Sequence, residues 1–210
     1  MIAVVTNRHR RDVLDQVREA AAAGVDLVQI RERDLEARDL GALVRQAVAA
    51  TRGTATRVVV NDRLDVALAA GADGVHLRGD SMPSAAARRL APRPFLIGRS
   101  VHGVEEARAA GADVDFLIAG TVFPTASKPP GDLLGIHGLR RLCGASGVPV
   151  LAIGGIGPDQ LDAVAAAGAA GIAGIGWFDG RTPLAGIVEA VRRRFDTPRR
   201  PSYHTEIPTS

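Results

Sequence analysis

Ala21-Ala22-Ala23-Gly24-Val25-Asp26 stands directly before Leu27-Val28-Gln29-Ile30, and a closely similar phrase returns three times along the chain. The other copies are Ala69-Ala70-Gly71-Ala72-Asp73 before Gly74-Val75-His76-Leu77, Ala109-Ala110-Gly111-Ala112-Asp113 before Phe116-Leu117-Ile118, and Ala166-Ala167-Gly168-Ala169 before Gly171-Ile172-Ala173. Each copy predicts an alanine-rich helix, a glycine in the left-handed conformation that ends the helix, and a buried strand. The repetition therefore predicts a series of helix-to-strand units.

Four further apolar runs lie between these units: Ile2–Thr6, Arg57–Asn61, Phe95–Ser100 and Val148–Ile153. Helical stretches separate all eight strands, for example Arg11–Ala23, Leu40–Thr51, Val104–Ala110 and Leu184–Arg194. Short apolar strands that alternate with helices are typical of a parallel sheet covered on both faces. Eight such units within 210 residues favour an α/β fold closed into a single (β/α)₈ TIM barrel over an open doubly wound sheet.

The predicted barrel takes up residues 1–195 as one domain. Residues 196–210 are rich in Pro, Ser and Thr, and we expect them to form a flexible C-terminal tail. Aromatic residues make up only 3% of the chain and hydrophobic residues 46%, so aliphatic side chains must fill the interior.

The chain has 26 Lys and Arg residues against 23 Asp and Glu. A small basic excess with few aromatic residues is weak evidence for nucleic-acid binding, because proteins that bind nucleic-acid bases favour aromatic stacking platforms. The same charge fits an anionic small-molecule substrate equally well, and we expect no nucleic-acid partner. A lone cysteine, Cys143, excludes an intrachain disulfide. No apolar run reaches the roughly 18–20 residues of a membrane span or resembles a signal peptide. These features predict a cytoplasmic protein with no membrane association.

Cationic side chains follow two of the predicted strands, at the end of a barrel where active sites form. Arg31 and Arg33 come after Gln29, and Lys128 comes in the long loop after the sixth strand. Strand alternation aims Gln29, Arg31 and Arg33 toward one side. Guanidinium groups suit phosphate oxygens in a bidentate geometry, so we interpret these cations as a phosphate site rather than as solvated surface charges.

Glycine-rich segments follow the last two predicted strands. They are Gly154-Gly155-Ile156-Gly157 and Gly174-Ile175-Gly176. The loops at these places in a (β/α)₈ barrel commonly bind phosphate through backbone N–H groups. The alternative is that these are ordinary turn glycines.

Two carboxylates, Asp62 and Asp80, follow the third and fourth strands. Acids beside phosphate-binding cations favour Mg²⁺ bridging to phosphate. Capping of the next helix is an equal alternative for Asp80 and a weaker one for Asp62. His76 and His102 also lie near strand ends, but a lone histidine there is more often structural than catalytic.

Together these segments resemble the superfamily of thiamine phosphate synthases and TenI-like thiazole tautomerases, over about residues 2–180. The resemblance is carried by six segments in order: Val28-Gln29-Ile30-Arg31-Glu32-Arg33, Val60-Asn61-Asp62-Arg63, Gly74-Val75-His76-Leu77, Ile97-Gly98-Arg99-Ser100-Val101-His102, Gly120 to Lys128, and Ala152-Ile153-Gly154-Gly155-Ile156.

The resemblance to the synthases implies a transferase of thiamine biosynthesis. Such an enzyme condenses hydroxymethylpyrimidine diphosphate with thiazole phosphate and releases pyrophosphate, with Mg²⁺ as cofactor. By match to the family's motifs, the pyrimidine diphosphate is held by Gln29, Arg31, Arg33, Asn61, Ser100 and Lys128, with Arg31, Arg33, Ser100 and Lys128 as the catalytic set. The same match implies that Asp62 binds the metal and that Thr125, Ser127 and Gly155 hold the thiazole phosphate. Gly176 replaces a serine of the family there, and we expect its backbone N–H to bind the same phosphate.

The chain departs from both branches of the superfamily. Against the synthase pattern, Arg33 stands in place of lysine, Ser81 in place of the second metal-binding aspartate with Asp80 one residue earlier, and Gly176 in place of serine. Arg31-Glu32-Arg33 and Gly98 to His102 read more like the tautomerases, yet Thr121 stands where their proton-shuttling histidine belongs. A threonine hydroxyl is a poor general base near neutral pH. We therefore favour a synthase, with a tautomerase or a non-catalytic phosphate-binding protein as alternatives and the oligomeric state left open.

Overall fold

The computed structural model describes residues 1–125, 133–175 and 182–196 of the chain. Eight parallel strands pair in sequence order, and β8 pairs with β1 to close a barrel. The strands are β1 (Ile2–Val5), β2 (Leu27–Ile30), β3 (Arg57–Asn61), β4 (Gly74–Leu77), β5 (Leu96–Val101), β6 (Phe116–Ala119), β7 (Val150–Ile153) and β8 (Gly171–Gly174). The predicted single (β/α)₈ barrel is confirmed.

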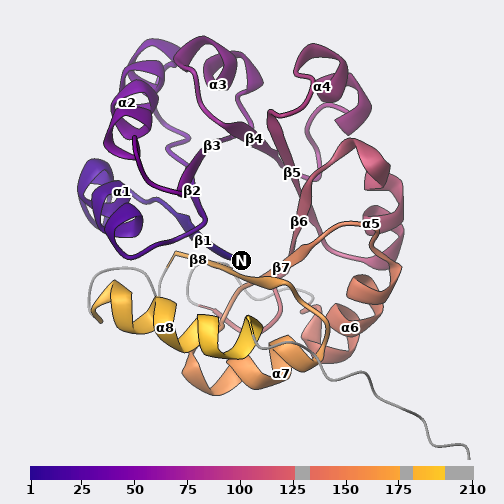
Figure 1. Cartoon of the computed structure of the whole chain (residues 1–210). Coiled ribbons are helices and arrows are strands. Elements are labelled where there is room, and N and C mark those ends of the chain that lie inside the picture. The colour runs from indigo at the N-terminus through magenta and orange to yellow at the C-terminus, as the bar shows by residue number, and fades with distance from the viewer. Residues whose placement is uncertain (126–132, 176–181, 197–210) are drawn as a thin grey trace, which may run out of the picture.

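The helices form a ring around the strands (Figure 1). They are α1 (Val13–Ala22), α2 (Ala37–Ala50), α3 (Leu64–Ala70), α4 (Ser84–Leu90), α5 (Val104–Ala110), α6 (Gly135–Ala145), α7 (Leu161–Ala166) and α8 (Leu184–Phe195). Short 3₁₀ helices, η1 (Gly111–Asp113) and η2 (Pro158–Gln160), lie after α5 and before α7. Among the described residues, no helix has the length and apolarity that a membrane crossing needs.

The repeated alanine–glycine phrase ends a helix in each of its four copies, as predicted. The backbone angle φ is positive at every one of the four glycines, Gly24, Gly71, Gly111 and Gly168. Such angles are readily available only to glycine, which explains why the phrase requires it.

An aspartate in three of the units ties neighbouring strands together at the amino-terminal end of the barrel. Its carboxylate accepts a hydrogen bond from a backbone N–H of the preceding strand. The pairs are Asp26 with Ile2 at 2.6 Å, Asp73 with Val58 at 2.8 Å and Asp115 with Ile97 at 2.7 Å. The third aspartate is Asp115 and not the Asp113 of the repeated phrase, because the 3₁₀ helix η1 takes up Gly111–Asp113 before the strand begins.

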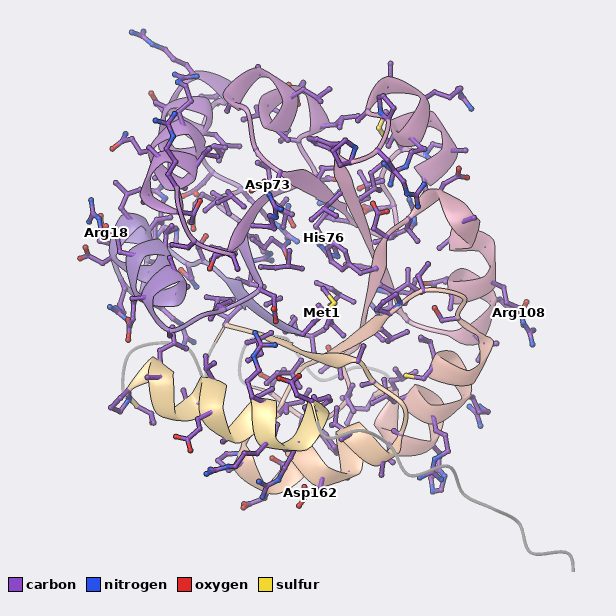
Figure 2. The ribbon with its side chains drawn as sticks, in the orientation of Figure 1. Met1, Arg18, Asp73, His76, Arg108 and Asp162 are labelled. Atoms are coloured by element: carbon purple, nitrogen blue, oxygen red, sulfur yellow. The ribbon has the colours of Figure 1, made fainter. Side chains whose placement is uncertain are left out.

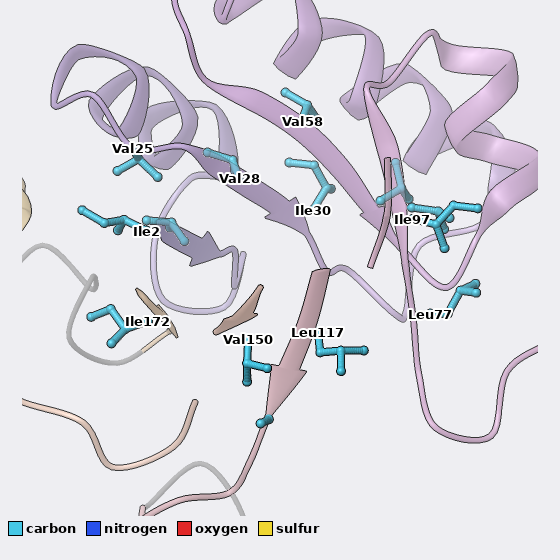
Figure 3. Close-up of a cluster of buried hydrophobic side chains, with 14 of the residues drawn as sticks. Ile2, Val25, Val28, Ile30, Val58, Leu77, Ile97, Leu117, Val150 and Ile172 are labelled. Atoms are coloured by element: carbon cyan, nitrogen blue, oxygen red, sulfur yellow. The ribbon is translucent and has the colours of Figure 1, made fainter. Parts of the chain in front are cut away.

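Two apolar layers lie on the two faces of the sheet, which explains why the strands are apolar at nearly every position. The larger layer packs the outer faces of the strands against the helices (Figure 3). The smaller layer fills the barrel interior and consists of Ala3, Leu27, Val59, Phe116, Ile118, Leu151 and Ala173. Phe116 is so closely packed there that a Cβ atom on Gly98 would lie 2.2 Å from its ring.

Residues 126–132, 176–181 and 197–210 lie outside the described residues. The predicted C-terminal tail falls almost wholly in the last of these segments, so its flexibility stays a prediction.

Candidate active site

A cavity of about 390 Å³ opens at the carboxyl ends of the barrel strands. This volume lies within the range of small-molecule sites. Its walls are formed by residues from all eight strands or the loops after them, including Asn7, Gln29, Arg31, Arg33, Asn61, His76, Arg78, Ser100, His102, Thr121, Thr125, Gly154, Gly155, Gly174 and Ile175.

Strand alternation places these residues. Leu27 belongs to the inner apolar layer. Gln29 and Arg31 therefore lie on the same inner face, each closer to the mouth of the barrel. His76 and Arg78 have the same relation to each other on β4 and its loop. Seven predicted site residues thus come together at this cavity: Gln29, Arg31, Arg33, Asn61, Ser100, Thr125 and Gly155.

The mouth of the cavity is strongly cationic. Arg10, Arg31, Arg33 and Arg78 line it, and no Asp or Glu appears among its described lining residues. Burial, together with the charges of Arg33 and Arg78, lowers the pKa of the Arg31 guanidinium despite the opposing charge of Glu32. The guanidinium groups therefore repel one another, and a bound anion would relieve that repulsion.

A buried carboxylate fixes the backbone that carries Arg31. Glu32 is 5% exposed and accepts hydrogen bonds from the Thr6 hydroxyl at 2.6 Å and the Arg8 backbone N–H at 3.1 Å. The N–H of Arg31 donates in turn to the Thr6 hydroxyl at 3.0 Å. The ends of β1 and β2 are thus locked together, which orients Arg31 toward the cavity.

Polar amide groups lie deeper in the cavity. The Gln29 amide donates to Asn61 Oδ1 at 3.0 Å, although Gln29 is only 3% exposed. This arrangement can orient a polar ring by hydrogen bonds, beside aliphatic lining residues such as Ile118 and Ile172.

The two predicted metal ligands do not line the cavity but lie beside it. The Asp62 carboxylate accepts a hydrogen bond from the Ser81 hydroxyl and is ion-paired with Arg78, whose Nε lies 3.1 Å away. The Asp80 carboxylate is 74% exposed and pairs with Arg78 Nη2 at 3.0 Å. Neither aspartate caps the following helix: α3 and α4 begin after Arg63 and Pro83, without a side-chain cap. The capping alternative is therefore wrong.

The predicted glycine loop after β7 faces the cavity from the opposite side. Gly154 and Gly155 have φ angles of 101° and 64°. A Cβ atom on Gly155 would lie 2.3 Å from the Pro124 carbonyl oxygen and 2.8 Å from Phe123 Cβ. Only glycine allows this close packing of the two loops, which brings Thr125 and Gly155 to the same wall.

Three of the predicted site residues, Ser127, Lys128 and Gly176, lie outside the described residues. Their roles stay predictions.

His76 forms part of the cavity floor. It is 4% exposed, and its ring stacks on Phe116 with centroids 6.0 Å apart. Figure 2 shows it inside the ring of strands, whereas Arg18, Arg108 and Asp162 point outward from the helices. Burial, opposed by the Arg99 backbone and the charge of Asp62, lowers the pKa of His76 to about 4. The imidazole is therefore neutral at physiological pH, as a structural histidine is.

We expect this histidine to make stability depend on pH. The pKa of His76 falls from 6.5 to about 4 on folding, so between these values the unfolded chain binds the extra proton. The contribution of His76 to the free energy of unfolding is fully present above pH 6.5. It decreases as the pH falls toward 4, and the loss is about 2 kcal/mol at pH 5. Urea unfolding of His76→Asn should show a flatter pH profile than wild type. The exposed His137→Asn serves as control, and parallel profiles for His76→Asn and wild type would contradict the assignment.

Comparisons with known proteins identify the family of this chain. A family model described as thiamine monophosphate synthase matches residues 2–177. The chain belongs to this family. A thiamine-phosphate synthase of Methanoregula boonei is 45% identical over 182 residues, which cover 86% of this chain and 84% of the relative.

Solved structures extend the same finding. The thiamine phosphate pyrophosphorylase of Pyrococcus furiosus superposes with a TM-score of 0.82 and 35% identity, over 93% of this chain and 95% of that one. A 3-hexulose-6-phosphate synthase superposes with a TM-score of 0.66 at 20% identity, over 92% of this chain and 99% of that one, and shows a shared fold alone. The resemblance to the thiamine monophosphate synthase family is confirmed.

Sequence reasoning missed Arg78, Asn7 and Arg10 as lining residues. Arg78 was within reach, because it lies two residues after His76 and alternation points both inward. Asn7 and Arg10 carry a weaker signal, since they lie in the loop after β1, whose path the sequence does not reveal.

Proposed function

We propose that this protein is a thiamine phosphate synthase. It joins hydroxymethylpyrimidine diphosphate to thiazole phosphate and releases pyrophosphate. The observation that carries the proposal is the cationic cavity at the barrel mouth, lined by Arg31, Arg33, Asn61 and Ser100, in a chain that belongs to the thiamine monophosphate synthase family.

The cavity divides between the two substrates. The side formed by β2 to β5 carries the arginines and would hold the diphosphate, while Gln29 and Asn61 contact the pyrimidine. The side formed by β6 to β8 carries Thr125 and Gly155 and would hold the monophosphate of the thiazole. Ser127 and Gly176 are proposed to complete that side, and Lys128 to reach the diphosphate.

The reaction needs charge stabilisation more than proton transfer. The bond from the pyrimidine methylene carbon to the diphosphate oxygen breaks, and its electron pair stays on the diphosphate. The thiazole nitrogen then donates its lone pair to the methylene cation, so the new C–N bond forms and the positive charge ends on that nitrogen. No proton is gained or lost. Arg31 and Arg33 stabilise the departing diphosphate electrostatically, and no general base is required.

Mg²⁺ is proposed as the cofactor, held through Asp62. Mg²⁺ typically binds through one or two carboxylates together with substrate phosphates, and the Asp62 carboxylate with the Ser81 hydroxyl offers suitable oxygen donors beside the cavity. The described residues contain no cluster of three or more His, Cys, Asp or Glu, so we expect substrate phosphates and water to supply most of the remaining ligands. When bound, the ion would neutralise charge on the diphosphate. The exposed Asp80 stays a predicted second ligand.

The proposal is tested by incubating the purified protein with both phosphorylated substrates and Mg²⁺. We expect thiamine phosphate and pyrophosphate in equal amounts, and Asp62→Asn should greatly reduce both the rate and its dependence on Mg²⁺. The absence of product at every Mg²⁺ concentration, with a folded protein, would exclude the synthase.

The same protein distinguishes the alternatives. A tautomerase would isomerise a phosphorylated thiazole carboxylate without Mg²⁺ or the pyrimidine substrate. A non-catalytic binding protein would be stabilised against heat by the phosphorylated ligands but would turn none of them over.

A further inference from the structure

Arg78 is the side chain that the β4–α4 loop presents to the cavity. It lines the mouth together with Arg31 and Arg33, whereas Asp62 and Asp80 do not line it. Both carboxylates are instead paired with the Arg78 guanidinium, at 3.1 and 3.0 Å. The side chain of this loop that a diphosphate in the cavity would contact is therefore a fixed cation and not a carboxylate.

The loop holds Arg78 in this position by several hydrogen bonds. The backbone N–H of Arg78 donates to the Ser81 hydroxyl at 2.9 Å, and that hydroxyl donates to Asp62. From β5, the Arg99 guanidinium donates to the carbonyl oxygens of Gly79 and Met82, both at 2.9 Å. The loop is thus anchored to β3 and to β5, and Arg78 is preorganised rather than free to swing into solvent.

The Arg78 guanidinium remains accessible from the cavity. Its side chain is 39% exposed and lines the mouth, whereas its Nε is shielded from solvent beside Asp62, whose Oδ2 lies 3.1 Å away. Within the described part of the chain this Nε makes no hydrogen bond of good geometry, so Asp62 satisfies the guanidinium incompletely, and a phosphate oxygen is a strong acceptor for its accessible N–H groups.

We propose that Arg78 is a diphosphate-binding residue, which shares its guanidinium between Asp62 and the diphosphate and so makes diphosphate binding partly independent of Mg²⁺. The proposal rests on the proposed function. It has a second consequence for the metal: because Arg78 and Mg²⁺ compete for the Asp62 carboxylate, Arg78 weakens metal binding when no diphosphate is present.

Two binding measurements with opposite expected signs test this. In calorimetry with EDTA, Arg78→Gln should raise the Kd of inorganic pyrophosphate by about 30-fold, the loss expected for a charge-assisted contact. With Mn²⁺ alone, as a spectroscopic substitute for Mg²⁺, the same variant should bind the ion more tightly, by roughly 5-fold, because Asp62 loses its competing cation. Damage to the fold would instead weaken the binding of both pyrophosphate and Mn²⁺.

Two further variants make the result specific. Arg78→Lys keeps the positive charge but loses the paired N–H donors of the planar guanidinium, so it should bind pyrophosphate with an intermediate Kd. Arg63→Gln is the matched control: this arginine follows β3 as Arg78 follows β4, pairs with Asp65 at 2.6 Å and is absent from the described cavity lining. It should change neither measurement.

The possible failures are distinguishable. If wild type binds pyrophosphate without metal and Arg78→Gln binds it equally well, the role of Arg78 is overturned while the proposed function stands. Weaker Mn²⁺ binding by Arg78→Gln would also overturn the competition with the metal. If wild type binds no pyrophosphate with or without Mg²⁺, the proposed function itself fails.

Discussion

Replacement of Arg31 by alanine is expected to lower kcat/KM for the pyrimidine diphosphate by roughly two to three orders of magnitude. Arg31 lies half-buried in the cavity mouth beside Arg33 and Arg78, and burial lowers the pKa of its guanidinium. A charge placed in such a site stabilises a leaving diphosphate far more than a solvated charge does, since water screens it less. Steady-state kinetics with each substrate varied in turn would measure the effect.

Two further variants define what Arg31 contributes. Arg31→Lys retains a positive charge but loses the planar fork, so we expect a smaller decrease, of about tenfold. Arg38→Ala removes an exposed arginine of α2 and should leave the kinetics unchanged. A decrease below about fivefold for Arg31→Ala, or one confined to the KM of the thiazole phosphate, would contradict the assignment of this side of the cavity to the diphosphate.

The barrel was predictable because its information is local. The helix-ending glycines at positions 24, 71, 111 and 168 and the apolar strands after them recur along the chain, and each signal acts within a few residues. Most of the site followed from the same periodicity. Once Leu27 faces the barrel interior, alternation alone carries Gln29 and Arg31 to the mouth.

Loop geometry was not predictable in this way, because contacts between distant residues determine it. The direction of Asp80 depends on Arg78, and the path of their loop depends on Arg99 from the next strand. Strand alternation indicates that Arg78 points inward, but the sequence does not show that Arg78 pairs with both carboxylates near the mouth. The 3₁₀ helix η1 is a similar case, since it moves the strand-pairing role from Asp113 to Asp115.

Replacement of Gly155 by alanine is expected to impair use of the thiazole phosphate selectively, as replacement of Arg31 is expected to impair use of the pyrimidine diphosphate. The new Cβ atom would lie 2.3 Å from the Pro124 carbonyl oxygen, and the φ angle of 64° is unfavourable for alanine. Backbone must therefore move, and the loop that carries Thr125 moves with it. We expect kcat/KM for the thiazole phosphate to fall by about 100-fold, as misplaced binding groups typically cause.

Gly157→Ala is the matched control within the same loop, because its φ is −129° and its added Cβ would meet only Gln160 Oε1, at 3.3 Å. That side-chain atom can shift, so the control should stay within about threefold of wild type. The KM for the pyrimidine diphosphate should change little in Gly155→Ala, because Arg31 and Arg33 lie on the opposite wall. Equal losses for both substrates would mean that the two halves of the cavity act as one. Normal kinetics in Gly155→Ala would show that the loop after β7 does not hold the monophosphate.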